Sequence, residues 1–218
     1  MILAMLSAAA LVAAEPINPR VWATPTDYPS KALRENQGGA PRFRLTIAAD
    51  GTPIKCEITD PTPYEELNTI SCELLMRRAR FKPAMDVAGK PTFAVYQQRL
   101  LWWVEGMKPI GRSQRSDAIV TVKRLPGEIP NPAWVRLAFA IDATGTPTNC
   151  QPLLPESPSR AGSKAAETEQ RVLDVLGSTA CKYAQDTLEL TAAIDSNGNP
   201  VPSVQTYTIL FEEEVGSD

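Results

Sequence analysis

Two parts of the chain carry the same order of sequence signals, and this repeat constrains the fold more than any other feature. The first part contains residues 43–47, Gly51-Thr52-Pro53 and Cys56. The second part contains, in the same order, residues 137–141, Gly145-Thr146-Pro147 and Cys150. Beyond them, Cys72 aligns with Cys181, and the turn at 86–91 aligns with the turn at 195–200. An insertion in the polar stretch 157–171 accounts for the wider spacing in the second part. We therefore predict two homologous units of about 80 residues each in tandem, rather than a solenoid.

Each unit is predicted to be α+β, with a β-hairpin, a helix and a final antiparallel strand. In the first unit, alternating apolar side chains at 43–47 and 54–58 indicate two strands around the Asp50-Gly51 turn. The aromatic and β-branched stretch 93–104 reads as the last strand.

A helix is expected between the hairpin and the last strand. Apolar residues recur there at helical spacing, from a start near Tyr64 to an end near Arg80, before Pro83. The stripe is formed by Cys72, Leu75, Met76 and Ala79. The second unit repeats the plan with strands at 137–141, 148–153 and 204–212 and a helix at 168–182.

The four cysteines allow three disulfide pairings, and no Cys-x-x-Cys motif is present. Only Cys56–Cys72 and Cys150–Cys181 place a bridge at the same location in both units. In the first unit the strand and the helix also turn their cysteines toward one interior. We predict these two disulfides, with four buried free thiols as the alternative.

Residues 1–14 are apolar or small and precede Glu15-Pro16. The run is too short to cross a bilayer and ends in the small residues that a signal peptidase accepts, so a signal peptide is expected although no Lys or Arg precedes it. The alternatives are a short membrane anchor and a misplaced start codon.

Composition excludes several classes of function. The chain has no histidine, which removes Ser-His-Asp and Cys-His catalysis and every histidine-containing zinc site. A net charge of −3 argues against binding of nucleic acid. The loop at 195–200 lacks the glycine and glutamate positions of an EF-hand and is expected to be a turn. We predict no enzymatic activity, catalytic residue, metal, cofactor or small-molecule substrate.

The first unit resembles the TonB C-terminal domain, in its cysteine-bearing version. The resemblance rests on the order of Tyr28-Pro29, Ala32-Leu33, the Asp50-Gly51 hairpin, the run 77–84 (RRARFKPA), Gly89 and a last strand that ends in Trp102. It covers residues 28–104, whereas residues 134–214 are similar mainly through the repeat. The chain departs from the family at Asp60-Pro61-Thr62-Pro63 and in the second unit, which lacks the basic helix end.

The expected organisation is a signal peptide (1–14), a TonB C-terminal-like domain (28–105), a linker (106–130) and a degenerate second repeat (131–214). Residues 119–122 have the composition of a short strand within the linker. The first unit carries a net charge of +2 and the second of −6, so the units are expected to attract one another.

The resemblance implies that the last strand of the first unit takes up an extended peptide of an outer-membrane or envelope protein by β-strand addition. The expected edge is Ala94, Val95, Tyr96, Gln97, Gln98, Arg99, Leu100, Leu101, Trp102 and Trp103. We also expect the protein to lie in the periplasm of a Gram-negative envelope and to have a link to TonB-dependent transport. It is expected to be a monomer or a homodimer.

Two alternatives stay open. In a structural periplasmic protein, the two units cover each other's edges and no peptide site survives. In a membrane-retained energy transducer, the N-terminal segment anchors the chain in the inner membrane.

Two surface features have both a structural and a functional interpretation. Trp102 and Trp103 point to opposite faces of a strand, so at most one is core, and the other is a possible platform for sugars or bases. The basic run Arg77, Arg78, Arg80 and Lys82 suits the C-terminal end of a helix dipole, with an anionic partner as the alternative.

Overall fold

The computed structural model describes residues 10–106, 116–155 and 158–214. The main elements are the strands β2 (Arg42–Ile47), β3 (Pro53–Asp60), β6 (Pro91–Arg99), β7 (Ala118–Val122), β8 (Ala133–Ile141), β9 (Pro147–Leu153) and β12 (Ser203–Glu213), and the helices α2 (Glu65–Arg78) and α3 (Lys164–Thr187). Short elements complete the chain: β1 (Glu15–Pro16), the 3₁₀ turns η1 (Pro19–Val21) and η2 (Pro25–Asp27), α1 (Ser30–Arg34), β4 (Phe81–Lys82), β5 (Ala84–Met85), β10 (Ala193–Ile194) and β11 (Pro200–Val201). The fold class is α+β, as predicted.

Both halves of the chain order their elements in the same way. The hairpin β2–β3, helix α2 and strand β6 of the first half correspond to the hairpin β8–β9, helix α3 and strand β12 of the second. In each half the last strand pairs antiparallel with the first strand of the hairpin. Helix α3 extends beyond the predicted 168–182 at both ends, and strand β6 ends at Arg99 rather than at residue 104.

Each hairpin turn holds a glycine that no other residue can replace without strain. Gly51 and Gly145 have φ angles of 87° and 88°, in the left-handed region. A Cβ on Gly51 would lie 2.0 Å from the carbonyl oxygen of Phe81, and one on Gly145 would lie 3.2 Å from that of Leu190. The turn of each hairpin is therefore pressed against the chain that follows the helix.

The two predicted disulfides are present and connect hairpin to helix in each half. Cys56 on β3 bonds to Cys72 on α2, and Cys150 on β9 bonds to Cys181 on α3. Among the described residues there is no free cysteine. Each bridge holds a helix against its own hairpin, beside the buried apolar stripe of that helix.

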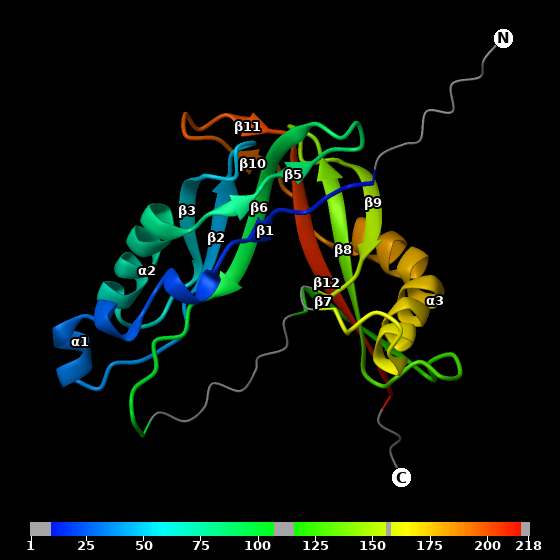
Figure 1. The fold of residues 1–218 in the computed structure, drawn as a ribbon, viewed down its shortest axis with the longest axis horizontal. Helices are drawn as coiled ribbons and strands as arrows, with labels where there is room; N and C mark the ends of the chain where they lie inside the picture. The colour runs from blue at the N-terminus through cyan, green and yellow to red at the C-terminus, as the bar shows by residue number, and fades with distance from the viewer. Residues whose placement is uncertain (1–9, 107–115, 156–157, 215–218) are drawn as a thin grey trace.

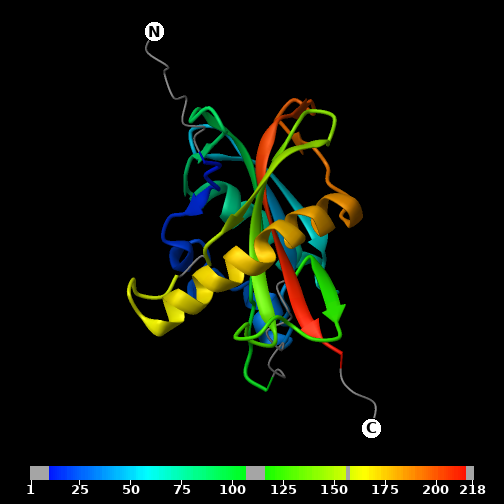
Figure 2. The ribbon, with the colours of Figure 1, turned by 90° about the vertical axis from the view of Figure 1, so that its right-hand side faces the viewer.

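The two halves share one sheet, in the order β3-β2-β6-β12-β8-β9, with β5 paired to β6 and β7 paired to β12. Strands β6 and β12 join parallel over three residue pairs, Phe93–Val95 with Ser203–Gln205. The two helices lie on opposite faces of the sheet, which Figures 1 and 2 show from directions at right angles. We call these the α2 face and the α3 face.

Each face carries its own core. On the α3 face, Leu137 and Phe139 of β8 pack with Leu176 and Ala180 of α3. On the α2 face, Phe43 and Leu45 pack with Leu75 and Ala79, and this core also takes in Ala94, Ala138 and Val204. The core of the first half therefore continues onto the back of the second half, where small alanine side chains let the two halves approach closely.

The contacts between the halves include few charged side chains. Among the ion pairs formed by the described residues, none connects residues 28–105 to residues 131–214. Arg42 instead pairs with Asp117, at the end of the predicted linker. Backbone pairing and apolar packing form most of the junction, and Asp117 adds a link from Arg42 to Thr208.

The predicted linker is not wholly irregular. Its residues 107–115 lie outside the described part of the chain, and Ala118–Val122 form β7, parallel to Ile209–Glu213 of β12. This strand includes residues 119–122, whose composition indicated a strand.

The end of the predicted signal peptide packs against the first half. Residues 1–9 lie outside the described residues, but Leu11 is 2% exposed and Ala14 is buried in the core of the α2 face. Val12 exchanges two backbone hydrogen bonds with Met85, of 3.1 and 2.9 Å, and β1 continues this pairing along β4. The N-terminal segment therefore acts as an extra short strand beside residues 80–85.

Removal of each disulfide by paired Cys→Ser substitution should lower the free energy of unfolding. For Cys56–Cys72, with a sequence separation of 16, the expected loss is about 3 kcal/mol, and for Cys150–Cys181, with a separation of 31, it is slightly larger. The reason is that a longer closed loop restricts the unfolded chain more. Urea unfolding of the two double variants measures both losses, and a clearly smaller loss for the longer loop would contradict this account.

Leu11→Ala should destabilise the full chain by roughly 2–5 kcal/mol, because a buried leucine is replaced by a cavity. The matched control is Val12→Ala, since Val12 is the next residue and its side chain is 48% exposed. Thermal and urea unfolding of the two variants test the packing of this segment. Equal, small effects would show that residues 10–14 do not belong to the core in solution.

Candidate functional site

The candidate site lies where strands β6 and β12 part. After the pair Val95–Gln205, β12 continues beside β7, and β6 continues beside β2 alone. We call this region the fork; it is bounded by residues 96–99 of β6 and 206–208 of β12. Figure 1 shows the two strands separating toward their C-terminal ends.

The predicted edge strand is only partly free. Ala94 and Val95 are already paired to Val204 and Gln205 of β12, so this part of the edge is occupied by the chain itself. Leu100 to Trp103 follow the end of β6, and the backbone of Trp102 pairs with Gly39. The usable edge is therefore shorter than the ten residues expected, because the second half covers its beginning and the strand ends early.

The backbone amides of Gln97 and Arg99 face the fork. The amides of Leu100 and Trp102 donate to the carbonyl oxygens of Pro41 and Gly39, on the β2 side of the strand. Successive residues of a strand direct their amides to opposite edges, so those of residues 97 and 99 point away from β2. No described strand pairs with residues 97–99 on that side.

A cavity of about 420 Å³ opens beside this edge on the α3 face. It is lined by Arg42, Arg44, Thr59, Asp60, Gln97, Asp117, Leu188, Glu189, Thr191 and Tyr207. These residues come from β2, β3 and β6 of the first half, from β12 and the segment after α3 in the second half, and from the connection between them. The site thus exists only where the two halves meet.

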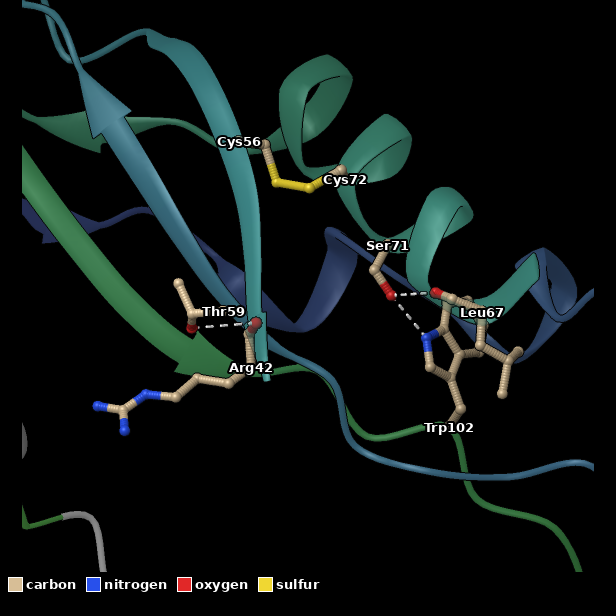
Figure 3. The surroundings of a disulfide bond; sticks show 7 residues. All are labelled: Arg42, Cys56, Thr59, Leu67, Ser71, Cys72 and Trp102. Atoms are coloured by element: carbon tan, nitrogen blue, oxygen red, sulfur yellow. Dashed lines mark hydrogen bonds between the residues drawn. A yellow bond between two sulfur atoms is a disulfide. The ribbon is translucent and has the colours of Figure 1, made fainter. Parts of the chain in front are cut away.

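Asp117 links β12 to Arg42 of β2 across the fork. Its backbone amide donates to the carbonyl oxygen of Thr208 at 2.7 Å, and its carboxylate accepts from the amide of Thr208 at 2.7 Å. The other carboxylate oxygen accepts from Arg42 at 2.9 Å. Arg42 points away from α2, toward the α3 face (Figure 3). Both oxygens of this carboxylate are therefore satisfied within the protein.

Tyr207 and Arg44 form the deep part of the cavity. Burial raises the pKa of Tyr207 to about 12, so its phenol stays protonated at neutral pH, and its hydroxyl donates to Gln205 at 3.0 Å. Arg44 has a side chain that is 15% exposed, yet its contacts are long: 3.5 Å to the hydroxyl of Thr191 and 3.8 Å to the carboxylate of Glu57. A guanidinium has five donors, so Arg44 retains unused hydrogen-bonding capacity.

Trp102 and Trp103 separate as predicted, one inside and one outside. Trp102 is 3% exposed and its indole N–H donates to the hydroxyl of Ser71 at 2.8 Å, while Ser71 donates to the carbonyl oxygen of Leu67 at 2.6 Å. Figure 3 shows this chain of hydrogen bonds beside the Cys56–Cys72 bridge. Trp103 is 53% exposed. Trp102 therefore belongs to a second core under α2 and is not available to a partner.

The basic run is largely engaged within the protein. Arg78 binds Asp27 through two hydrogen bonds of 2.6 and 2.7 Å, and Lys82 pairs with Glu15 at 2.9 Å. Arg80 donates to the carbonyl oxygens of Ala79 and Arg77. These contacts favour the structural interpretation of the run over an anionic partner.

The loop that starts at Asp195 forms the predicted turn. One carboxylate oxygen of Asp195 accepts from the backbone amides of Asn197 and Asn199, each at 2.8 Å. Among the described residues no group of His, Cys, Asp or Glu side chains is arranged to hold a metal ion.

The comparison with protein families matches this architecture. The family described as Gram-negative bacterial TonB protein C-terminal matches residues 24–102. This part of the chain is similar to a TonB C-terminal domain. The match begins before η2 and ends at Trp102, so it contains β2, β3, α2 and β6. The family that matches is one of periplasmic protein-interaction modules and is not enzymatic.

No curated protein and no solved structure matches the chain. Among the described residues, no helix has the length and apolarity needed to span a membrane. The second half, which the family comparison does not cover, shares with the TonB C-terminal domain its element order and the position of its disulfide.

Asp27→Asn should weaken the dependence of the free energy of unfolding on pH in the acidic range. Arg78 holds the pKa of Asp27 well below its usual range, chiefly through hydrogen bonds. The native state thus favours the ionised carboxyl, and its contribution is complete above the unfolded-state pKa of about 3.9 and declines as the pH falls below that value.

Thermal unfolding of wild type and Asp27→Asn between pH 2.5 and 7 tests this assignment. The difference in melting temperature should be greatest near neutral pH and shrink below about pH 4. Glu15→Gln, which removes the exposed pair with Lys82, serves as the control and should change stability little. A difference that does not depend on pH would contradict the assignment.

Proposed function

We propose that the protein is a periplasmic protein-binding module that takes up an extended peptide of an outer-membrane or envelope protein by β-strand addition at the fork. The observation that carries this proposal is the divergence of β6 and β12, after which residues 97–99 of β6 have a described strand on one side only. The backbone groups of Gln97 and Arg99 on that side are suited to a peptide strand.

The family supports the class of partner. TonB C-terminal domains are protein-interaction modules, and β6 is the last strand of the matched region. The open length of β6 is short, so backbone pairing alone provides few hydrogen bonds. Side-chain contacts in the adjacent cavity must therefore contribute to recognition.

A second candidate function has an observation in its favour. Strand β12 pairs with residues 93–95 of β6, so the second half already covers the beginning of the edge. In a structural periplasmic protein this pairing would be the purpose of the second half, and the fork would bind nothing.

Gln97→Pro should abolish capture of a partner, and Gln97→Ala should retain most of it. Proline removes the backbone N–H that faces the fork but leaves the hydrogen bonds of β6 to β2, whereas alanine removes only the side chain. The measurement is capture of detergent-solubilised envelope proteins by the immobilised chain, followed by identification of the captured protein and titration with its extended segments.

Circular dichroism and melting temperature show whether the proline variant is still folded. Equal binding by the two variants would contradict strand addition at this edge. Absence of binding by folded wild type would favour the structural alternative.

A further inference from the structure

We propose that the surface covered by residues 10–14 is a second peptide site, which takes an extended segment of another protein with a leucine and, three positions later, an alanine. This site lies on the α2 face, is separate from the fork and does not depend on strand addition there. Removal of the signal peptide expected at residues 1–14 makes it available, because cleavage after Ala14 takes away the residues that cover it.

Backbone pairing to residues 80–85 holds the N-terminal segment on one side. Val12 pairs with Met85, and β1 continues the same antiparallel register along β4, up to a hydrogen bond of 2.8 Å from the amide of Ile17 to the carbonyl oxygen of Arg80. Between these two parts the partner strand contains Pro83, which has no N–H to donate. Residues 10–14 can therefore detach while β1 stays paired.

On its other side the segment contacts the second half. The backbone amide of Leu11 donates to the side-chain oxygen of Gln151 on β9 at 2.9 Å. Gln151 lies opposite Ala138 in the pairing of β8 with β9, so both side chains are on the α2 face. Leu11 and Ala14 are buried in the core that also includes Ala138. Figure 1 shows the segment passing from β1 toward β9. The covered surface therefore belongs to both halves.

Contacts that do not involve residues 10–14 keep this surface in place. Ala84–Met85 of β5 pair with residues 91–92 of β6, and the amide of Phe81 donates to the carbonyl oxygen of Gly51 at 3.0 Å. Strand β8 is paired on both sides, to β9 and to β12. Without residues 10–14, the backbone N–H and C=O of Met85 that pair with Val12 become available to another strand. A preformed surface of this kind lowers the entropic cost of binding a peptide.

The burial of the segment defines which peptide fits. Leu11 and Ala14 are 2% and 6% exposed, whereas Val12 is 48% exposed. The first buried position takes a large apolar side chain, and the second takes a small one because a larger group would overpack the core. A charged residue at either position would lose its hydration without gaining a partner. The position of Val12 faces solvent and accepts any residue.

The test opens the site in the full chain by Leu11→Asp. A carboxylate is too costly to bury at this position, so residues 10–14 should leave the surface while the rest of the chain stays folded. Val12→Asp is the matched control, because its side chain points outward and the site should stay covered. Melting temperatures verify that both variants are folded, and Leu11→Ala replaces Leu11→Asp if the latter is not.

The probe is the capped peptide Ala-Leu-Val-Ala-Ala, which has the sequence of residues 10–14. NMR follows its binding through the backbone amide of Met85 and the side-chain amide of Gln151. The peptide should bind Leu11→Asp but neither wild type nor Val12→Asp, in which the segment already fills the site. The same peptide with alanine in place of leucine should bind about tenfold more weakly or worse, since burial of the larger side chain is lost.

The exported wild-type protein tests the role of the signal peptide. Mass spectrometry should show that this protein begins at Glu15, and it should bind the probe as tightly as Leu11→Asp does. An exported chain that retains residues 10–14 and binds no probe would make the segment a permanent strand, which would overturn its replacement by a partner.

The remaining outcomes each overturn a different part of the proposal. Equal binding of the peptides with and without leucine would contradict the selection for a large apolar residue. Shifts at Gln97 and Arg99 instead of Met85 would place the peptide at the fork and overturn the second site. Absence of binding to folded Leu11→Asp, or to an exported chain that begins at Glu15, would overturn the second site and leave the function proposed for the fork unaffected.

Discussion

Three parallel residue pairs between β6 and β12 join the two halves into one sheet, and the rest of the architecture is arranged around them. They place the last strands of two similar halves side by side, so that one sheet runs from β3 to β9 with a helix on each face. Each half then contributes to the other: the core of the α2 face extends onto Ala138 and Val204 of the second half. Because β12 turns away to pair with β7, the same junction ends in a fork, and the candidate site is a direct product of the pairing.

Within each half, the helix is held against its hairpin by one disulfide and one buried stripe. A unit of about 80 residues buries a limited fraction of its apolar surface, and a crosslink compensates by restricting the unfolded chain. Trp102 adds a second layer of packing under α2 through its hydrogen bond to Ser71. With its helix and hairpin fixed in this way, the first half can offer the edge of β6 without depending on a partner for its own order.

The elements inside each half were predictable from the sequence because their signals are local. Alternation of apolar and polar residues identified the hairpins, and apolar residues at helical spacing identified the buried face of α2. The repeat selected Cys56–Cys72 and Cys150–Cys181 among the possible disulfides. The β6–β12 junction was not predictable, since Ala94 and Val204 have the same apolar character whether they face a helix or another half. Arg44 likewise reads as a solvated residue on the outer side of a strand, and only the position of Thr191 and Tyr207 reveals that it lines a cavity. The packing of Leu11 in the core of the α2 face was not predictable either, because the apolar composition of residues 1–14 suits an export signal and a buried strand alike.

The brevity of the β6–β12 pairing has a consequence for the order in which the molecule assembles. Hairpins and helices form from contacts that are close in sequence, whereas Phe93 and Ser203 must meet across a long loop, and closing that loop costs entropy before any contact compensates it. The junction is therefore expected to form late, after the two units that it joins.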